Sequence, residues 1–177
     1  GRGHRSGAGG GGVGVARRDG GARVLSPAPA APLPGGRLAL GDYVTPNESE
    51  AEGLTGLPVG SVEDARRAAE ALRAKGAGAA IITLGERGVL FHNGRLSELV
   101  PAFKAGAVVE TTGAGDAFNG GFAAGLARGM DPLAAARFGC AAAAISVTRP
   151  GAAASMPTLA EIRALLAEDK IRGSGSP

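Results

Sequence analysis

The stretch that decides the fold of this chain is Val109-Glu110-Thr111-Thr112-Gly113-Ala114-Gly115-Asp116-Ala117-Phe118-Asn119-Gly120-Gly121. β-branched residues lead into a turn with two glycines, and an alanine-rich segment follows. We therefore predict a strand over residues 107–110, a tight turn, and a helix that runs to about Arg128, with Gly129 beyond it. The first N–H groups of such a helix are unpaired, and its dipole attracts anions.

This stretch has two interpretations. In the functional one, the amides of Gly113, Ala114, Gly115 and Asp116 hold a phosphate, and the Asp116 carboxylate acts as base for an attacking hydroxyl. In the other, the segment is an ordinary strand–turn–helix with a favourable acid in the first turn. Taken in isolation, the pattern favours the ordinary interpretation.

The flanking sequence predicts strands that alternate with helices. We expect strands over 22–25, 43–45 and 79–84, and a hairpin of 89–91 and 96–100 about Asn93-Gly94. We expect helices that start at Thr45 (N-cap, with Pro46 at N1 and Glu48 at N3), at Ser61, at Asp131-Pro132 and at Pro157. This order predicts an α/β fold with a mostly parallel sheet flanked by helices. Ligands bind beyond the carboxyl ends of such strands, where Gly85 and Gly113 are expected, and this favours the functional interpretation.

Composition and charge narrow the class of protein. A length of 177 residues suits one domain, and 44% hydrophobic residues support a core. The net charge of +3 comes from the first 21 residues, which hold four arginines and one aspartate. The remainder is neutral and the whole chain has only 3% aromatic residues, which argues against nucleic-acid binding. We expect no membrane span and no signal peptide, and the single cysteine, Cys140, fits a cytoplasmic protein.

Several catalytic classes lack their motifs. No lysine follows a glycine, which excludes a P-loop, and neither G-x-S-x-G nor a zinc-type cluster of His and Cys occurs. Phosphoryl transfer without a P-loop remains. The loop Gly85-Glu86-Arg87-Gly88 is a candidate nucleotide contact, and Asn47 and Glu50 offer oxygens for hydrated magnesium.

Four segments in order resemble the ribokinase family of sugar and nucleoside kinases, also called the PfkB family. They are residues 111–120, 45–52 (Thr-Pro-Asn-Glu-Ser-Glu-Ala-Glu), 82–88 (Ile-Thr-Leu-Gly-Glu-Arg-Gly) and 141–152. The Pro-rich residues 26–30 resemble the loop before the family's Asn-bearing helix. The resemblance covers about residues 16–168 and implies a ribokinase-like fold that lacks its N-terminal side.

The resemblance also implies roles for individual residues. Asp116 would be the base, and residues 113–115 would form the anion hole. The ATP-binding site would be lined by Asn47, Thr83, Gly85, Arg87, Gly88, Gly115, Asp116 and Cys140, with Cys140 near the adenine. Magnesium would be linked to Asn47 and Glu50, and an activating potassium ion to Glu110, Thr112, Ser146, Arg149, Gly151 and Ser155. Asn47 and Glu50 have an alternative as a plain helix cap, Cys140 as a core residue, and Ser155 as a loop residue.

The implied reaction is ATP-dependent phosphorylation of D-ribose at O5 to D-ribose 5-phosphate, in a cytoplasmic enzyme that is a possible homodimer when full-length. Alternatives are a family kinase for another sugar or a nucleoside, and a nucleotide-binding fragment without turnover. Glu110 stands where the family usually has Asp, and the family's N-terminal half is absent. We expect residues 1–15 to be a disordered leader, 16–170 the kinase portion, and 171–177 a disordered tail.

Overall fold

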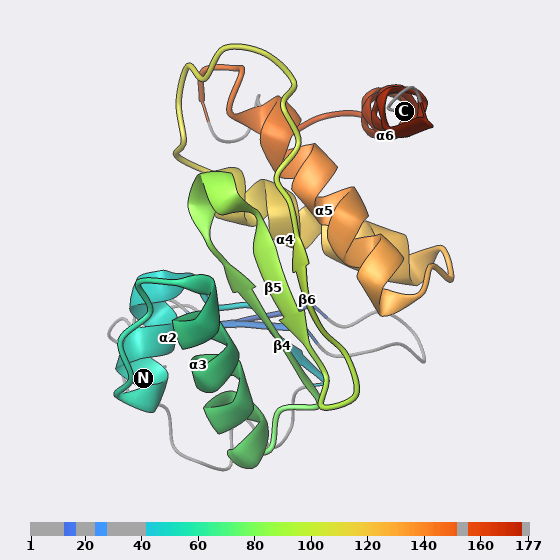
Figure 1. Cartoon of the computed structure of the whole chain (residues 1–177). Helices are drawn as coiled ribbons and strands as arrows, with labels where there is room; N and C mark the ends of the chain where they lie inside the picture. The colour runs from blue at the N-terminus through green and yellow to red at the C-terminus, as the bar shows by residue number, and fades with distance from the viewer. Residues whose placement is uncertain (1–12, 17–23, 28–41, 152–155, 175–177) are drawn as a thin grey trace, which may run out of the picture.

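A six-stranded sheet with helices on both faces forms the centre of the molecule (Figure 1). The computed structural model describes residues 13–16, 24–27, 42–151 and 156–174. The strands lie in the order β1 (Val13–Ala16), β2 (Val24–Pro27), β3 (Tyr43–Val44), β4 (Ala79–Thr83), β5 (Val89–His92) and β6 (Ser97–Val100). The helices are α2 (Glu48–Thr55), α3 (Val62–Ala74), the short 3₁₀ helix η1 (Gly85–Arg87), α4 (Ala114–Ala127), α5 (Pro132–Ser146) and α6 (Leu159–Ser174).

The α/β class and the flanking helices are confirmed, but the sheet is mixed. Strands β2, β3 and β4 are parallel, whereas β1, β5 and β6 each join an antiparallel neighbour. The sheet therefore has fewer parallel strand pairs than the prediction of a mostly parallel sheet required. A parallel partner needs a crossover, which α2 and α3 supply between β3 and β4, while the Asn93-Gly94 turn reverses the chain at once between β5 and β6.

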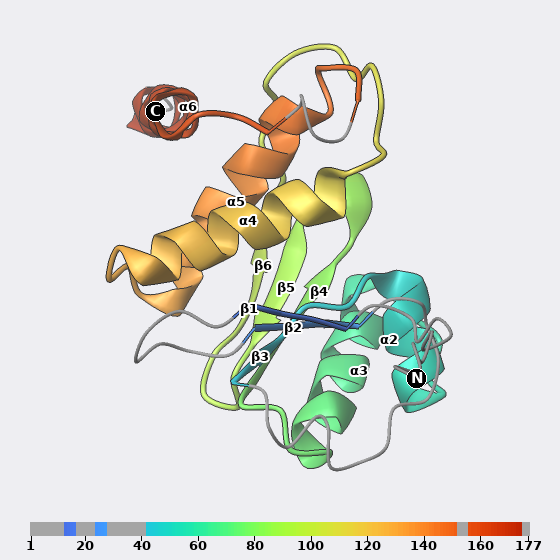
Figure 2. The same ribbon diagram turned by 180° about the vertical axis from the view of Figure 1, so that it is seen from behind.

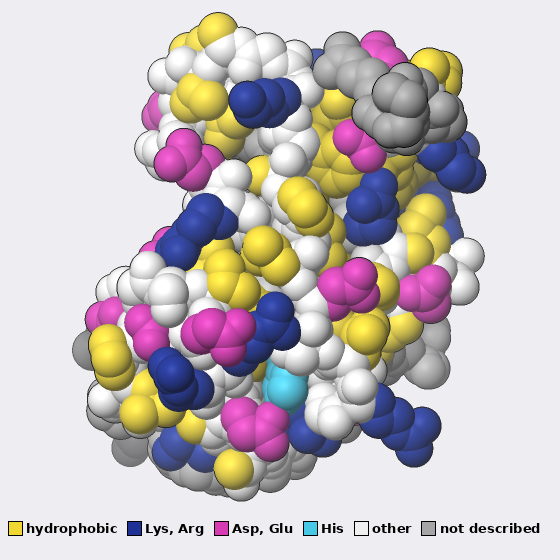
Figure 3. Space-filling view, viewed as in Figure 1, with side chains coloured by type: hydrophobic (Ala, Val, Ile, Leu, Met, Phe, Trp, Pro, Cys, Tyr) yellow, Lys and Arg dark blue, Asp and Glu magenta, His cyan; other side chains and the backbone are white. Residues whose placement is uncertain are grey.

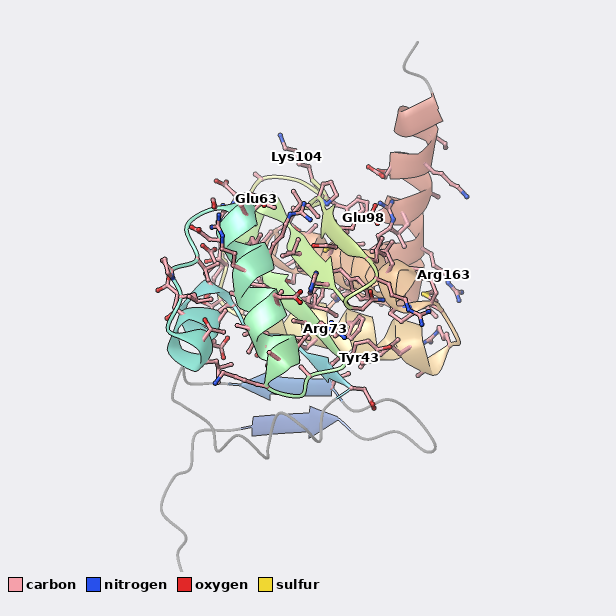
Figure 4. The ribbon with its side chains drawn as sticks, turned by 60° about the horizontal axis from the view of Figure 1, so that its bottom comes forward. Tyr43, Glu63, Arg73, Glu98, Lys104 and Arg163 are labelled. Carbon is pink, nitrogen blue, oxygen red and sulfur yellow. The ribbon has the colours of Figure 1, made fainter. Side chains whose placement is uncertain are left out.

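The side chains of β4 alternate between two cores. Ala80 and Ile82 pack with α2 and α3, whereas Ala79 and Ile81 pack with α4 and α5. Figure 2 shows α4 and α5 on one side of the sheet, and Figure 4 shows α3, with Glu63 and Arg73 near its two ends, on the other. Because β4 is buried on both faces, it is a continuous apolar run and not an alternating one.

Two predicted local structures are wrong. Residues 107–110 form no strand: Val108 and Val109 are 66% and 60% exposed, and the Val109 and Glu110 amides both donate to the Val147 carbonyl. β-branched composition suggested a strand, but no neighbouring strand pairs with this segment. The helix after β3 is capped by Asn47 and not by Thr45, because Asn47 and Glu50 form the reciprocal capping box.

β1 and α6 overlap the predicted leader and tail. Val13–Ala16 form β1, and α6 continues to Ser174, so parts of the predicted leader and tail are regular. Residues 1–12, 17–23 and 175–177 lie outside the described residues. The range 17–23 includes the first two residues of the predicted strand 22–25. The division into three segments stays a prediction. Within the described ranges, no helix has the length and hydropathy to cross a bilayer.

Helices α4 and α5 approach each other closely because glycines face the contact. A Cβ on Gly121 would lie 2.9 Å from the Gly139 Cα, and a Cβ on Gly139 would lie 2.8 Å from the Phe118 carbonyl oxygen. Both distances are shorter than a Cβ atom tolerates, so a side chain at either glycine would push the helices apart. The pair holds Phe118 and Phe122, whose rings stack 6.0 Å apart, against the sheet.

We predict that Gly121→Ala lowers the free energy of unfolding by about 1–3 kcal/mol, because its methyl group meets backbone on α5. Gly120→Ala is the matched control, since its methyl group would meet only the flexible end of Met156. Alanine there is expected to be neutral or to stabilise the helix by up to about 1 kcal/mol. Urea unfolding of both variants measures the contrast, and equal effects would contradict the packing argument.

Candidate functional site

The site begins at the first turn of α4. Gly113 is the N-cap with φ +87°, a left-handed conformation that favours glycine. The Ala114 amide donates to the Thr111 carbonyl, but within the described residues no partner is recorded for the amides of Gly113, Gly115 and Asp116. A Cβ on Gly115 would meet nothing within 4 Å, so the turn opens to solvent. Asp116 is exposed beside these amides.

Two other segments of the predicted site lie at the same edge of the sheet. Asn47 forms a parallel bridge with Thr83, and the Thr83 amide donates to the Pro46 carbonyl at 3.0 Å. The residues after β3 and after β4 are thereby joined where their strands end. In Figures 1 and 2 the start of α4 and the turn that follows β4 lie toward the same end of the sheet.

The direction of α4 explains why its start lies at this edge. Tyr43 packs edge-on against Phe122, with ring centroids 5.2 Å apart. From this contact, Asp116 lies six residues back along α4, about 9 Å at 1.5 Å per residue. Asn47 lies four residues onward along the chain that leaves β3. Because α4 runs opposite to β3, both displacements lead toward the carboxyl edge of the sheet.

Asn47 and Glu50 use part of their hydrogen-bonding capacity on each other. The Asn47 Oδ1 accepts from the Glu50 amide at 2.8 Å, and the Glu50 Oε1 accepts from the Asn47 amide at 3.0 Å. The Glu50 Oε2, however, is buried and has no partner in the described part of the chain. Glu50 is 9% exposed, and burial raises its pKa, partly opposed by the hydrogen bond from Asn47. The capping box uses only the Oε1 atom of Glu50, so it does not explain why Oε2 is buried without a partner.

The residues of the Gly85–Gly88 loop differ in their surroundings. Gly85 has φ +61° and open space about its Cβ position. Arg87 forms an ion pair with Glu48 at 3.1 Å and donates to the Gly60 carbonyl at 3.3 Å, so it ties the loop to the start of α2. Nothing in the sequence pattern pointed to Glu48 beyond an acid at a helix start. The Gly88 Cβ position lies 1.9 Å from the Val100 carbonyl oxygen, a packing reason for glycine there.

The predicted potassium-linked residues are only partly brought together. The Glu110 Oε2 accepts from the Gly151 amide at 3.0 Å, which joins the two segments. Ser146 is buried and donates to the Ala143 carbonyl, while the Arg149 side chain pairs with Glu161. Thr112 is exposed, and Ser155 lies outside the described residues. No cluster of three or more His, Cys, Asp or Glu side chains suited to a metal was found in the described ranges.

Cys140 lies in the core with Phe118 and Phe122, and it is 5% exposed. Burial raises the pKa of its thiol to about 12, so the thiol stays protonated. These surroundings favour the core interpretation of Cys140 over contact with adenine.

The space-filling view shows the surface indented between the loop before α4 and helix α2 (Figure 3).

Comparisons with known proteins show which family the chain resembles. The profile described as pfkB family carbohydrate kinase matches residues 16–159. The ribokinase of Haemophilus influenzae is 45% identical over 147 residues, which are 83% of this chain and 48% of that protein. A crystal structure of Thermotoga maritima ribokinase matches with 42% identity and a TM-score of 0.74, covering 81% of this chain and 48% of that one.

The structure of Arabidopsis thaliana ribokinase complexed with ribose and ATP matches with a TM-score of 0.77 and 31% identity. The match covers 81% of this chain and 46% of the Arabidopsis chain. The chain thus spans about half the length of the curated relatives it matches.

We predict that Gly88→Ala destabilises the protein strongly, because the methyl group would overlap the Val100 carbonyl and the φ of +101° disfavours alanine. Gly85→Ala, with φ +61° in open space, carries only the backbone strain of about 1 kcal/mol. Thermal unfolding of the two variants measures the difference. Equal losses would show that Gly88 is not required by packing.

We predict that Glu50→Gln raises the free energy of unfolding more at pH 7.5 than at pH 4.5. The raised pKa means that the folded protein is favoured while Glu50 is protonated, and this advantage is lost as the pH rises from the ordinary glutamate range through the raised value. Glutamine keeps the capping acceptor without the buried charge. Urea unfolding at the two pH values tests this, and a pH-independent difference would contradict it.

Proposed function

Because the chain belongs to the pfkB family of carbohydrate kinases, we propose that it is the ATP-binding, phosphoryl-transferring portion of a kinase that converts D-ribose and ATP to D-ribose 5-phosphate and ADP. The observation that carries the proposal is the first turn of α4. There an exposed carboxylate, Asp116, stands beside amides that have no partner among the described residues, toward the edge of the sheet where Asn47 and Thr83 are bridged. The ribose and ATP in the Arabidopsis complex support the choice of substrates.

In the proposed reaction, the Asp116 carboxylate accepts the proton of the ribose 5-hydroxyl. The O5–phosphorus bond forms as the bond from the γ-phosphorus to the ADP oxygen breaks. The amides of Gly113, Gly115 and Asp116 donate to the transferred phosphoryl oxygens, where charge is concentrated in the transition state. Their position at a helix N-terminus adds the favourable dipole.

The proposal assigns nucleotide contacts to Thr83, Gly85 and Arg87. For Arg87 to reach a phosphate, its partly buried pair with Glu48 must open. The unpaired Glu50 Oε2 is an oxygen of the type that hydrated Mg²⁺ contacts, and Asn47 holds that carboxylate in place. Bound Mg²⁺ would neutralise phosphate charge.

Activation by K⁺ is proposed for the segment about Glu110, Ser146 and Gly151. It is supported by the hydrogen bond that joins Glu110 to the Gly151 amide. The longer Glu side chain, in place of the family's Asp, reaches that amide directly.

The alternative to this proposal is a nucleotide-binding unit without turnover. The two are separated by whether this chain phosphorylates ribose by itself.

We predict that Asp116→Asn lowers the turnover of ribose phosphorylation by about 10²–10⁴-fold, because the base is lost, with little change in ATP affinity. Glu98→Gln, an exposed carboxylate on β6, is the matched control and should leave both unchanged. ADP release and ATP titration calorimetry measure the two quantities. ATP binding without any phosphorylation by the unaltered chain would favour the alternative, and an active Asp116→Asn variant would refute the role of Asp116.

A further inference from the structure

A small group of polar side chains lies between α4 and the sheet, one turn along the helix from Asp116. The Asn119 Nδ2 donates to the Ser26 Oγ on β2 at 3.1 Å, across 93 residues of sequence. The surrounding contacts of α4 are apolar: Phe118 and Phe122 pack in the core with Val24 of β2. Asn119 is therefore the polar exception on the inner side of this helix.

Thr45 belongs to the same group by register. β2 and β3 are parallel, with Val24 opposite Tyr43 and Leu25 opposite Val44. Continued by one residue beyond the end of β3, this register would place Ser26 opposite Thr45. Val24 and Tyr43 face the α4 core, and side chains two residues on along a strand share that face. On this register, Ser26 and Thr45 would both face α4 near the carboxyl ends of β2 and β3.

Two oxygens of this group are buried without partners. The Thr45 Oγ1, on a residue 4% exposed, and the Asn119 Oδ1 have no hydrogen bond in the described part of the chain. Burying such atoms is costly, and an apolar pair of similar shape would avoid that cost. Fold stability alone therefore does not account for this polar group.

We propose that Asn119 is a positioning residue, which fixes α4 along its axis against β2 through Ser26 and so sets where Asp116 and its neighbouring amides stand. Apolar contacts between Phe118, Phe122 and the strands resist separation but are not directional. The hydrogen bond supplies a direction and a distance. Asn119 and Asp116 are three residues apart, so a shift of one moves the other. The role of Asn119 in placing Asp116 rests on the proposed function, whereas the experiment below does not depend on kinase activity.

The experiment is hydrogen–deuterium exchange of the full 177-residue chain, read at the amides of residues 117–121. Asn119→Ala and Ser26→Ala should each speed exchange there by roughly five-fold, the effect of losing one hydrogen bond. The double variant should exchange no faster than either single one, because both remove the same bond. Ser26→Thr keeps the hydroxyl and should restore the slow exchange.

Val59→Ala is the matched control, since Val59 lies in the core on the other face of the sheet. It should lower the melting temperature without selectively changing exchange at 117–121. Additive effects of the two alanine variants, no rescue by Ser26→Thr, or the same acceleration in Val59→Ala would overturn the proposal. None of these readouts requires kinase activity, so a chain that fails to phosphorylate ribose still tests the role of Asn119.

Discussion

The rest of the structure depends on how closely α4 packs against α5 and the sheet. Gly121 and Gly139 remove the side chains that would hold the two helices apart, and Phe118 and Phe122 then fill the space above β4. Because protein interiors are close-packed, this contact leaves the helix little freedom to slide or tilt. The first turn of α4, with Gly113 and Asp116, is thereby held at the carboxyl edge of the parallel strands.

The site combines rigid backbone with groups that are not fully satisfied. The Asn47–Glu50 cap and the bridge from Asn47 to Thr83 fix one side of it. The unpaired Glu50 oxygen and the free amides at the α4 start remain available for ligand atoms. Such unsatisfied groups reduce stability, and their gathering at one edge of the sheet is what a binding site for charged phosphates requires. The partly buried pair of Arg87 and Glu48 lies at that edge too.

Two sequence predictions failed for physical reasons that are informative. Residues 107–110 have strand-forming side chains, but strand formation also needs a neighbour to pair with, and here the amides of Val109 and Glu110 bond to the end of α5 instead. The β4–β5 and β5–β6 pairs are antiparallel because short turns join their strands, and such turns need less chain than crossovers. Cys140 shows the same limit, since its burial depends on which face of α5 meets α4.

The sequence by itself determined the elements whose signals are local. The glycine turn before α4, the capping residues Ser61 and Asp131, and the Asn93-Gly94 hairpin each act over a few residues, and the order of motifs was enough to indicate the family. Only the tertiary structure decided which oxygens are left unpaired at Glu50, Thr45 and Asn119, that Arg87 meets Glu48, and that Asn119 reaches Ser26. These are contacts between segments far apart in the chain, and they exist only once the helices are packed on the sheet.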